Sequence, residues 1–141
     1  MSEYLIKQLS IFIKNEPGCL AHLAATLKEC GINMKAFNIA ESSGFGVFRA
    51  IVDDPDRAFA KLSKKGIVVK ETNVIAIPMI DKPGGLFDVA KVMGDADINI
   101  EYGYAYSNKD AASFFFRVDD VNSAVEKLLA AGMKVLRESE I

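Results

Sequence analysis

The stretch Asn15-Glu16-Pro17-Gly18-Cys19-Leu20 returns 66 positions later as Asp81-Lys82-Pro83-Gly84-Gly85-Leu86. The rest of the chain repeats around these two stretches, because pairing residues 10–75 with residues 76–141 needs no gap and gives 17 identities in 66 pairs. A repeat of fixed period indicates two copies of one structural unit. We therefore expect two domains, residues 1–73 and residues 74–141, with one copy in each.

Both copies show the pattern strand, helix, strand, strand, helix, strand. In the first copy, apolar and polar residues alternate up to Lys14, as in a half-buried strand, and turn-forming residues follow. Apolar residues at helical spacing then predict a helix that Gly31 ends, and strands are expected at about 32–40 and 45–52. Asp54 and the proline after it predict the cap and first turn of the second helix.

The second copy repeats these signals, with Asp97 where the first copy has Gly31 and with Asp120 as the second cap. The last strand of the first copy, at about 67–72, is separated by Asn73 alone from the next strand, so we expect no flexible linker and rigid packing of the two units. The predicted fold is α+β: two ferredoxin-like βαββαβ units packed side by side, with antiparallel sheets and the helices on one face.

Composition and charge exclude several classes of protein. The net charge is −2, which provides no basic field for nucleic acid. No apolar run is long enough to span a membrane, and the first ten residues lack the apolar stretch of a signal peptide, so we expect a cytoplasmic protein. Cys19 and Cys30 have the spacing of neither a metal site nor a disulfide framework, and we expect both to be reduced.

Both faces of the predicted sheets carry apolar side chains. Val47 and Ile51 lie on the face opposite the expected core, and Tyr102, Tyr104 and Tyr106 share one face of their strand. Such a surface is typical of sheet packing within a protein or across a dimer, so we predict a homodimer.

The repeated loop has the chemistry of an amino-acid site. The first N–H groups of a helix are unpaired and lie at its positive end, so those of Gly18, Cys19 and Leu20 are candidates for binding an α-carboxylate. The Asn15 amide, or the Asp81 carboxylate in the second copy, is then an acceptor for the α-ammonium. The alternative is that these residues serve only the turn, and His22 is more typical of an exposed helix residue than of a ligand.

These loops, each followed by an Ile-Asn pair at the start of the second strand, resemble the ACT domain, a family of regulatory amino-acid-binding modules. The resemblance covers essentially the whole chain as a tandem pair. It implies a sensor or subunit rather than an enzyme, with no cofactor or metal, that binds a small amino acid at domain interfaces and contacts an enzyme or regulator. The candidate ligand-binding residues are Asn15, Pro17, Gly18, Cys19, Leu20 and Asn33 in the first copy and Asp81, Pro83, Gly84, Gly85, Leu86 and Asn99 in the second.

Three alternatives remain at this point. RNA-recognition motifs share the element order, and residues 11–15 and 44–48 resemble their two signatures, although the second copy keeps neither and the net charge is acidic. A ferredoxin-like phosphatase or metal chaperone fits less well, since the first loop has no arginine and neither copy has a Cys-x-x-Cys motif. A structural dimer without a ligand is the third.

Overall fold

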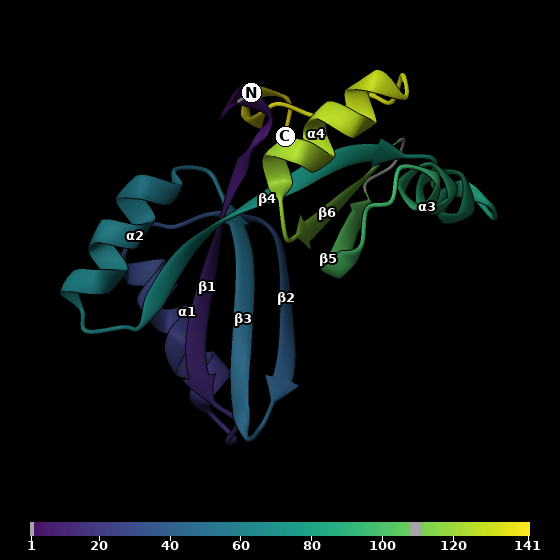
Figure 1. Cartoon of the computed structure of the whole chain (residues 1–141). Helices are drawn as coiled ribbons and strands as arrows, with labels where there is room; N and C mark the ends of the chain where they lie inside the picture. Colours follow the sequence, from purple (N-terminus) through teal and green to yellow (C-terminus); the bar gives the residue numbers. More distant parts are fainter. Residues whose placement is uncertain (1, 108–110) are drawn as a thin grey trace. The chain divides into compact units, whose positions relative to one another are not determined.

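The computed structural model describes residues 2–107 and 111–141. Its elements follow the predicted repeat (Figure 1). The first copy contains β1 (Ile6–Lys14), α1 (Cys19–Glu29), β2 (Met34–Ser42), β3 (Phe45–Val52) and α2 (Pro55–Lys64). The second contains α3 (Gly85–Asp95), β5 (Ile100–Ser107), β6 (Ala112–Val118) and α4 (Val121–Ala130). One strand, β4 (Val69–Met79), belongs to both copies, and two short 3-10 helices, η1 (Ser2–Tyr4) and η2 (Glu138–Glu140), complete the order.

Contacts divide the chain into two compact units. One unit is Lys7–Thr72, and the other combines Asn73–Ile141 with the residues before Lys7. The division falls inside β4, so no loop connects the units at this point. The N-terminal residues group with the second copy because Tyr4 and Leu5 pack against its core, and the Arg137 guanidinium lies 5.3 Å from the centre of the Tyr4 ring.

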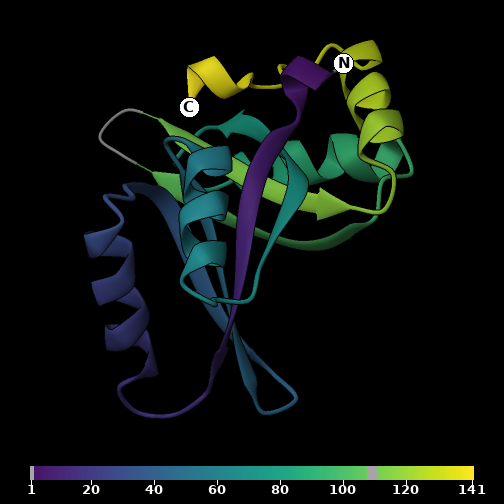
Figure 2. The ribbon, with the colours of Figure 1, turned by 90° about the vertical axis from the view of Figure 1, so that its left-hand side faces the viewer.

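The first unit is a split β-α-β sandwich. Its strands lie in the order β2-β3-β1-β4, and both β1 and β2 run antiparallel to β3. Figure 2 shows α1 and α2 on the same side of these strands. The two helices contribute to one core with alternate strand residues, which is why they cover a single face: Leu9, Ile11, Leu23, Leu27, Phe48, Ala50, Val52, Ala58 and Leu62.

The second unit repeats this arrangement with the order β4-β6-β5 and with α3 and α4 against the sheet. Its core contains Ile75, Ile77, Val89, Met93, Phe116, Val118, Ala124, Val125, Leu128 and Val135. The two copies therefore form the α+β ferredoxin-like units that the sequence predicts.

The last strand predicted for the second copy does not form as a regular strand. Leu136 is buried and its N–H donates to the Ala76 carbonyl at 2.8 Å, so this segment still lies against β4. The chain then turns into η2, where the Arg137 N–H donates to Glu140 Oε1 at 2.9 Å. The Arg137 N–H, which a longer strand would use for pairing, is therefore bonded within this turn.

The helix ends match their sequence signals. Asp54 accepts the Arg57 N–H at 3.3 Å, and Asp120 accepts the Ser123 N–H at 3.1 Å, so both predicted caps are confirmed. After α1 and α3 the chain turns through left-handed residues, Gly31 with φ 66° and Asp97 with φ 57°. The two copies therefore use the same backbone course even where their residues differ.

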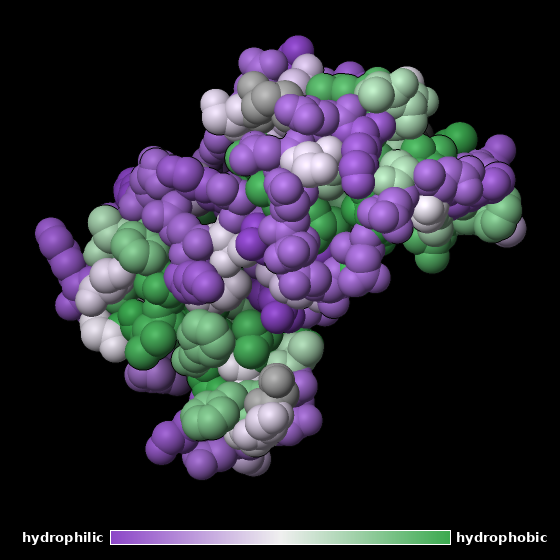
Figure 3. Space-filling view, in the orientation of Figure 1, coloured by the Kyte–Doolittle hydropathy of each residue, from purple (hydrophilic) through white to green (hydrophobic). Residues whose placement is uncertain are grey.

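Apolar side chains remain on the surface of each unit. In the first unit Phe12, Phe37 and Phe45 are exposed, and apolar side chains gather in the lower part of Figure 3, over the strands and helices of this unit. In the second unit Tyr104 stacks on Phe115 with ring centres 5.8 Å apart, whereas Tyr106 is 50% exposed. The tyrosine stripe thus packs partly within the protein.

Candidate ligand-binding site

The first loop closes tightly onto the start of α1. Gly18 has φ 89°, a left-handed conformation that residues with a Cβ rarely adopt. The Cys19 N–H donates to the Glu16 carbonyl at 3.2 Å, so this N–H, which the sequence suggested for a carboxylate, is already bonded. No side chain caps the helix. The His22 N–H donates to the Gly18 carbonyl at 3.0 Å, so Leu20 and Ala21 carry the first-turn N–H groups that the helix backbone leaves open.

A cavity of about 560 Å³ lies beside this helix end. We call it the Gly18 cavity. Its lining comes from β1, the first loop, α1 and the turn before β4: Phe12, Ile13, Lys14, Pro17, Gly18, Cys19, His22, Leu23, Gly66, Ile67 and Val68. A backbone hydrogen bond from the Phe12 N–H to the Val68 carbonyl (3.2 Å) joins two sides of this wall.

The wall of the Gly18 cavity has two kinds of surface. Lys14 and His22 lie near the positive end of α1, and no acidic residue occurs in the first turn of that helix. Apolar side chains such as Phe12 and Val68 form the remainder, and these two are 45% and 67% exposed. A carboxylate at the helix end and an apolar group against the wall are therefore the chemistry that this cavity matches.

The other predicted residues of the first loop line a second cavity, which shares Ile13 and Lys14 with the Gly18 cavity. A cavity of about 280 Å³ contains Asn15 and Leu20, together with residues of β2 and β3 such as Ile39 and Gly46. Pro17, Gly18 and Cys19 do not line it. The loop thus lies between two cavities, and the Asn15 amide lies in a different one from the start of α1.

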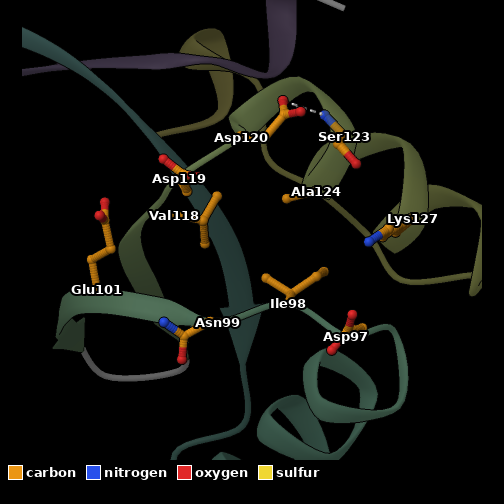
Figure 4. Close-up of a pocket in the computed structure, with 10 residues that line it drawn as sticks. All are labelled: Asp97, Ile98, Asn99, Glu101, Val118, Asp119, Asp120, Ser123, Ala124 and Lys127. Atoms are coloured by element: carbon orange, nitrogen blue, oxygen red, sulfur yellow. Dashed lines mark hydrogen bonds between the residues drawn. The ribbon is translucent and has the colours of Figure 1, made fainter.

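The two predicted asparagines lie apart from the loop residues. Asn33 Nδ2 donates to Asp53 Oδ2 at 3.1 Å, and Asn33 lines neither cavity of the first loop. Asn99 lines a third cavity, of about 240 Å³, where α3 ends and α4 begins (Figure 4). We call this the Asp97 cavity.

The second loop has the same backbone turn, but different groups pack against the start of its helix. Gly84 has φ 93°, and the Gly85 N–H donates to the Lys82 carbonyl at 3.0 Å, as Cys19 does to Glu16. A Cβ on Gly85 would lie 1.9 Å from the Ile80 carbonyl oxygen, so this loop packs its own backbone against the start of α3. Asp88 also adds a carboxylate to the first turn. None of the three cavities is lined by Asp81, Pro83, Gly84, Gly85 or Leu86.

Sequence reasoning missed part of the cavity wall. His22 is an exposed helix residue, as expected, yet it also lines the Gly18 cavity, and Ile67 and Val68 were not considered. The signal for the last two was present, because the fourth strand of a ferredoxin-like unit lies beside the first.

Charged groups elsewhere in the first unit influence one another. Lys7 Nζ donates to Asp56 Oδ1 at 2.7 Å, and this bond holds the pKa of the Asp56 carboxyl below its usual value. Burial, followed by the neighbouring Asp56 carboxylate, raises the pKa of Glu71. These three groups lie on β1, α2 and β4 and line none of the cavities.

Other site classes have little support in residues 2–107 and 111–141. These residues contain no group of three or more histidine, cysteine or acidic side chains arranged to hold a metal ion. Cys19 and Cys30 are both free thiols. Within the same two ranges, every helix is too short or too polar to cross a membrane.

Comparison with known proteins identifies the family. No curated protein matches the chain. Protein BT0572 from Bacteroides thetaiotaomicron has a crystal structure that is similar to this chain at 33% sequence identity and a TM-score of 0.89, covering 97% of this chain and 95% of that one. The regulatory subunit of aspartate kinase from Thermus thermophilus, in its ligand-free form, has the same fold at 15% identity and a TM-score of 0.62, over 89% of this chain and 91% of that one.

A longer protein contains the same fold as one part. E. coli aspartokinase III, in complex with lysine and aspartate, matches 90% of this chain over 31% of its own length, at 17% identity and a TM-score of 0.53. The sequence model described as an ACT domain pair matches residues 4–141. The chain therefore belongs to the family of ACT domain pairs.

Proposed function

We propose that this protein is a non-catalytic sensor that binds an amino acid in the Gly18 cavity and passes on its presence through contact with a partner protein. The observation that carries this proposal is one cavity that borders the positive end of α1, is lined by Lys14 and His22, and has an apolar wall. Membership of the ACT domain pair family supports it, because that family comprises regulatory amino-acid-binding modules.

The lining of the Gly18 cavity favours an amino acid with an apolar side chain. The first turn of α1, with Lys14 and His22 nearby, attracts the α-carboxylate. Leu23, Ile67 and Val68 then offer contact to a side chain such as that of leucine or valine. The remaining predicted residues of the first loop, Asn15 and Leu20, lie on the far side of the loop, where they influence its position rather than contact this ligand.

The ligand would act through assembly. A ligand shifts a conformational equilibrium only when it binds one state more tightly than the other, so regulation needs a partner surface that depends on the state of the loop. We propose a homodimer in the cytoplasm that contacts an enzyme or regulator of amino-acid metabolism. The exposed Phe37 and Phe45 provide apolar surface for such contacts, and a regulatory subunit of aspartate kinase has the same fold.

The RNA-binding alternative is disfavoured by where its signature residues lie. Phe12 and Phe45 are exposed, but Phe48 is only 2% exposed and belongs to the core of the first unit. Val47, at 9% exposure, offers no aromatic ring for base stacking.

A thermal-shift screen of the twenty amino acids tests the proposal. At about 100 times the dissociation constant, a ligand should contribute about 2.7 kcal/mol to stability, which corresponds to roughly 5 to 10 °C. We expect the largest shifts from apolar amino acids. No shift with any of the twenty would leave the structural dimer as the better account.

A matched pair of variants then locates the site. Val68→Asp places a carboxylate in the wall of the Gly18 cavity at an exposed position, so it should remove the shift with little effect on the fold. Lys134→Asp places an aspartate at the corresponding position of the second unit, 66 residues later, where it also removes the ion pair of Lys134 with Glu140 (2.9 Å); it should leave the shift that the ligand causes intact. Equal shifts in both variants would mean that the ligand binds elsewhere.

A further inference from the structure

The Asp97 cavity carries an excess of negative charge. This cavity has a volume of about 240 Å³. Its lining includes one ammonium group, that of Lys127, and four carboxylates: Asp97, Glu101, Asp119 and Asp120. Arg117 Nε lies 3.7 Å from Glu101 Oε1, and Asp120 accepts the Ser123 N–H at 3.1 Å, so two of the carboxylates are partly compensated. Figure 4 shows the side chains of Asp97 and Lys127 coming from opposite sides of the cavity.

The corresponding place in the first unit is filled by a guanidinium group of the chain itself. Arg57 Nη2 donates to the Cys30 carbonyl oxygen, at the end of α1, at 3.4 Å. Lys61 Nζ donates to the same oxygen at 3.2 Å. A guanidinium and an ammonium thus satisfy the negative end of the helix.

Position 57 of the first unit is position 123 of the second. Each residue is the third of its helix, and each N–H donates to the aspartate that caps the helix, so the local backbone is the same. Arg57 is replaced by Ser123, whose side chain is too short to cross to the end of α3. Lys61 corresponds to Lys127, so the ammonium group is kept. The replacement of Arg57 by Ser123 therefore removes the guanidinium alone.

Two further replacements change the charge at this place. Gly31 becomes Asp97 and Lys35 becomes Glu101, whereas Asp53 and Asp54 remain aspartates in the second unit. The left-handed turn is kept, since φ is 66° at Gly31 and 57° at Asp97. The second unit therefore has the same backbone turn as the first but lacks the guanidinium group. It has additional carboxylates, Asp97 and Glu101, at this place.

We propose that the Asp97 cavity binds a guanidinium group that comes from outside this chain, in the position that Arg57 occupies in the first unit. The carboxylates are spread around the cavity, and within the described parts of the chain they are not grouped to hold a metal ion. A planar guanidinium with five donors can bond several separated oxygens. The group can belong to a small molecule or to an arginine side chain of a partner protein. This site is separate from the Gly18 cavity and does not depend on the proposed function.

Titration with blocked arginine tests this site. N-acetyl-arginine amide is added to the ¹⁵N-labelled full chain, and the amide resonances of Asp97 and Ser123 are followed by NMR. We expect saturable shifts, with binding at least about ten-fold weaker for the neutral N-acetyl-citrulline amide, because charge-assisted hydrogen bonds are lost. Equal binding of the two compounds, or shifts elsewhere only, would overturn the proposal. Free arginine distinguishes the sources: weaker binding than the blocked form indicates a partner side chain, and tighter binding indicates a small molecule.

Two variants complete the experiment. Ser123→Arg restores the arrangement of the first unit and should abolish binding, whereas Asn122→Arg adds the same charge at the neighbouring exposed position and should retain most of it. Asp97→Gly keeps the left-handed turn, matches Gly31, and should weaken binding several-fold. Wild-type binding in both Ser123→Arg and Asp97→Gly would contradict the assignment.

Discussion

The loop after β1 and the loop after β4 begin their helices with the same left-handed glycine, but their surroundings differ. Beside the first loop lies the Gly18 cavity, with Cys19 and His22 in its wall. In the second loop the Ile80 carbonyl packs against Gly85, and Asp88 takes the place of His22. The reverse holds where α1 and α3 end. In the first unit Arg57 donates to the Cys30 carbonyl at the end of α1, whereas in the second unit the Asp97 cavity lies at the end of α3.

The two copies keep one backbone course, whereas the side chains around it differ. The helix starts, caps and left-handed turns are common to both copies, since they depend on a few glycines and aspartates. The side chains around those fixed points differ in size and charge. The two ligand sites that we propose therefore lie at different ends of the two units, at the Gly18 cavity in the first and the Asp97 cavity in the second.

The largest expected difference between the loops concerns stability. Gly85→Ala places a Cβ 1.9 Å from the Ile80 carbonyl oxygen, so the backbone of the second loop must move. We expect the free energy of unfolding, measured with urea, to fall by about 3 kcal/mol or more. Cys19→Ala, at the same position of the first loop, should change it by less than about 1 kcal/mol. Similar losses in both variants would remove the structural distinction between the loops.

The next difference concerns charge at the helix start. His22→Asp gives the first loop the residue of the second, and its carboxylate opposes that of a bound amino acid. Charges in the first turn contribute about 0.3–1 kcal/mol, so isothermal titration should show a two- to five-fold loss of affinity. Asp88→His serves as the control in the second loop and should leave the affinity unchanged. An unchanged affinity in His22→Asp would place the carboxylate away from α1.

The smallest difference concerns pH. The pKa of Glu71 is raised in the folded state, so its contribution to stability is present below its unfolded pKa and is lost as the pH rises through the folded value. Asp56, whose pKa is lowered, acts in the opposite sense at lower pH. We expect Glu71→Gln to gain stability relative to wild type as the pH rises above about 4.3, the usual pKa of a glutamate, by less than about 1 kcal/mol.

The control for this pH effect lies in the second unit. The position that corresponds to Glu71 is Arg137, so no equivalent carboxyl lies there. Arg137→Gln should therefore not reproduce the pH trend of Glu71→Gln. A difference between wild type and Glu71→Gln that does not vary with pH would show that the Glu71 carboxyl does not titrate in this range.

The repeat, the alternation of the strands and the helix caps made the fold predictable from the sequence, because each rests on local geometry. The last strand of the second copy was not predictable in this way, since η2 competes for the same backbone groups. The two glycines of the second loop look alike in sequence, and their roles separate only through the position of the Ile80 carbonyl. Likewise, the aligned copies show that Ser123 replaces Arg57. Only the structure shows what this replacement removes, namely the hydrogen bond from the Arg57 guanidinium to the Cys30 carbonyl.

The stoichiometry of amino-acid binding tests the central claim most directly. Isothermal titration of the full chain with the amino acid that gives the largest thermal shift should yield one site per chain, because the first loop borders the Gly18 cavity and residues 81–86 of the second loop line none of the three cavities described. The heat should disappear in Val68→Asp and persist in Lys134→Asp. Two equivalent sites per chain would contradict the account, as would one site that Val68→Asp leaves intact.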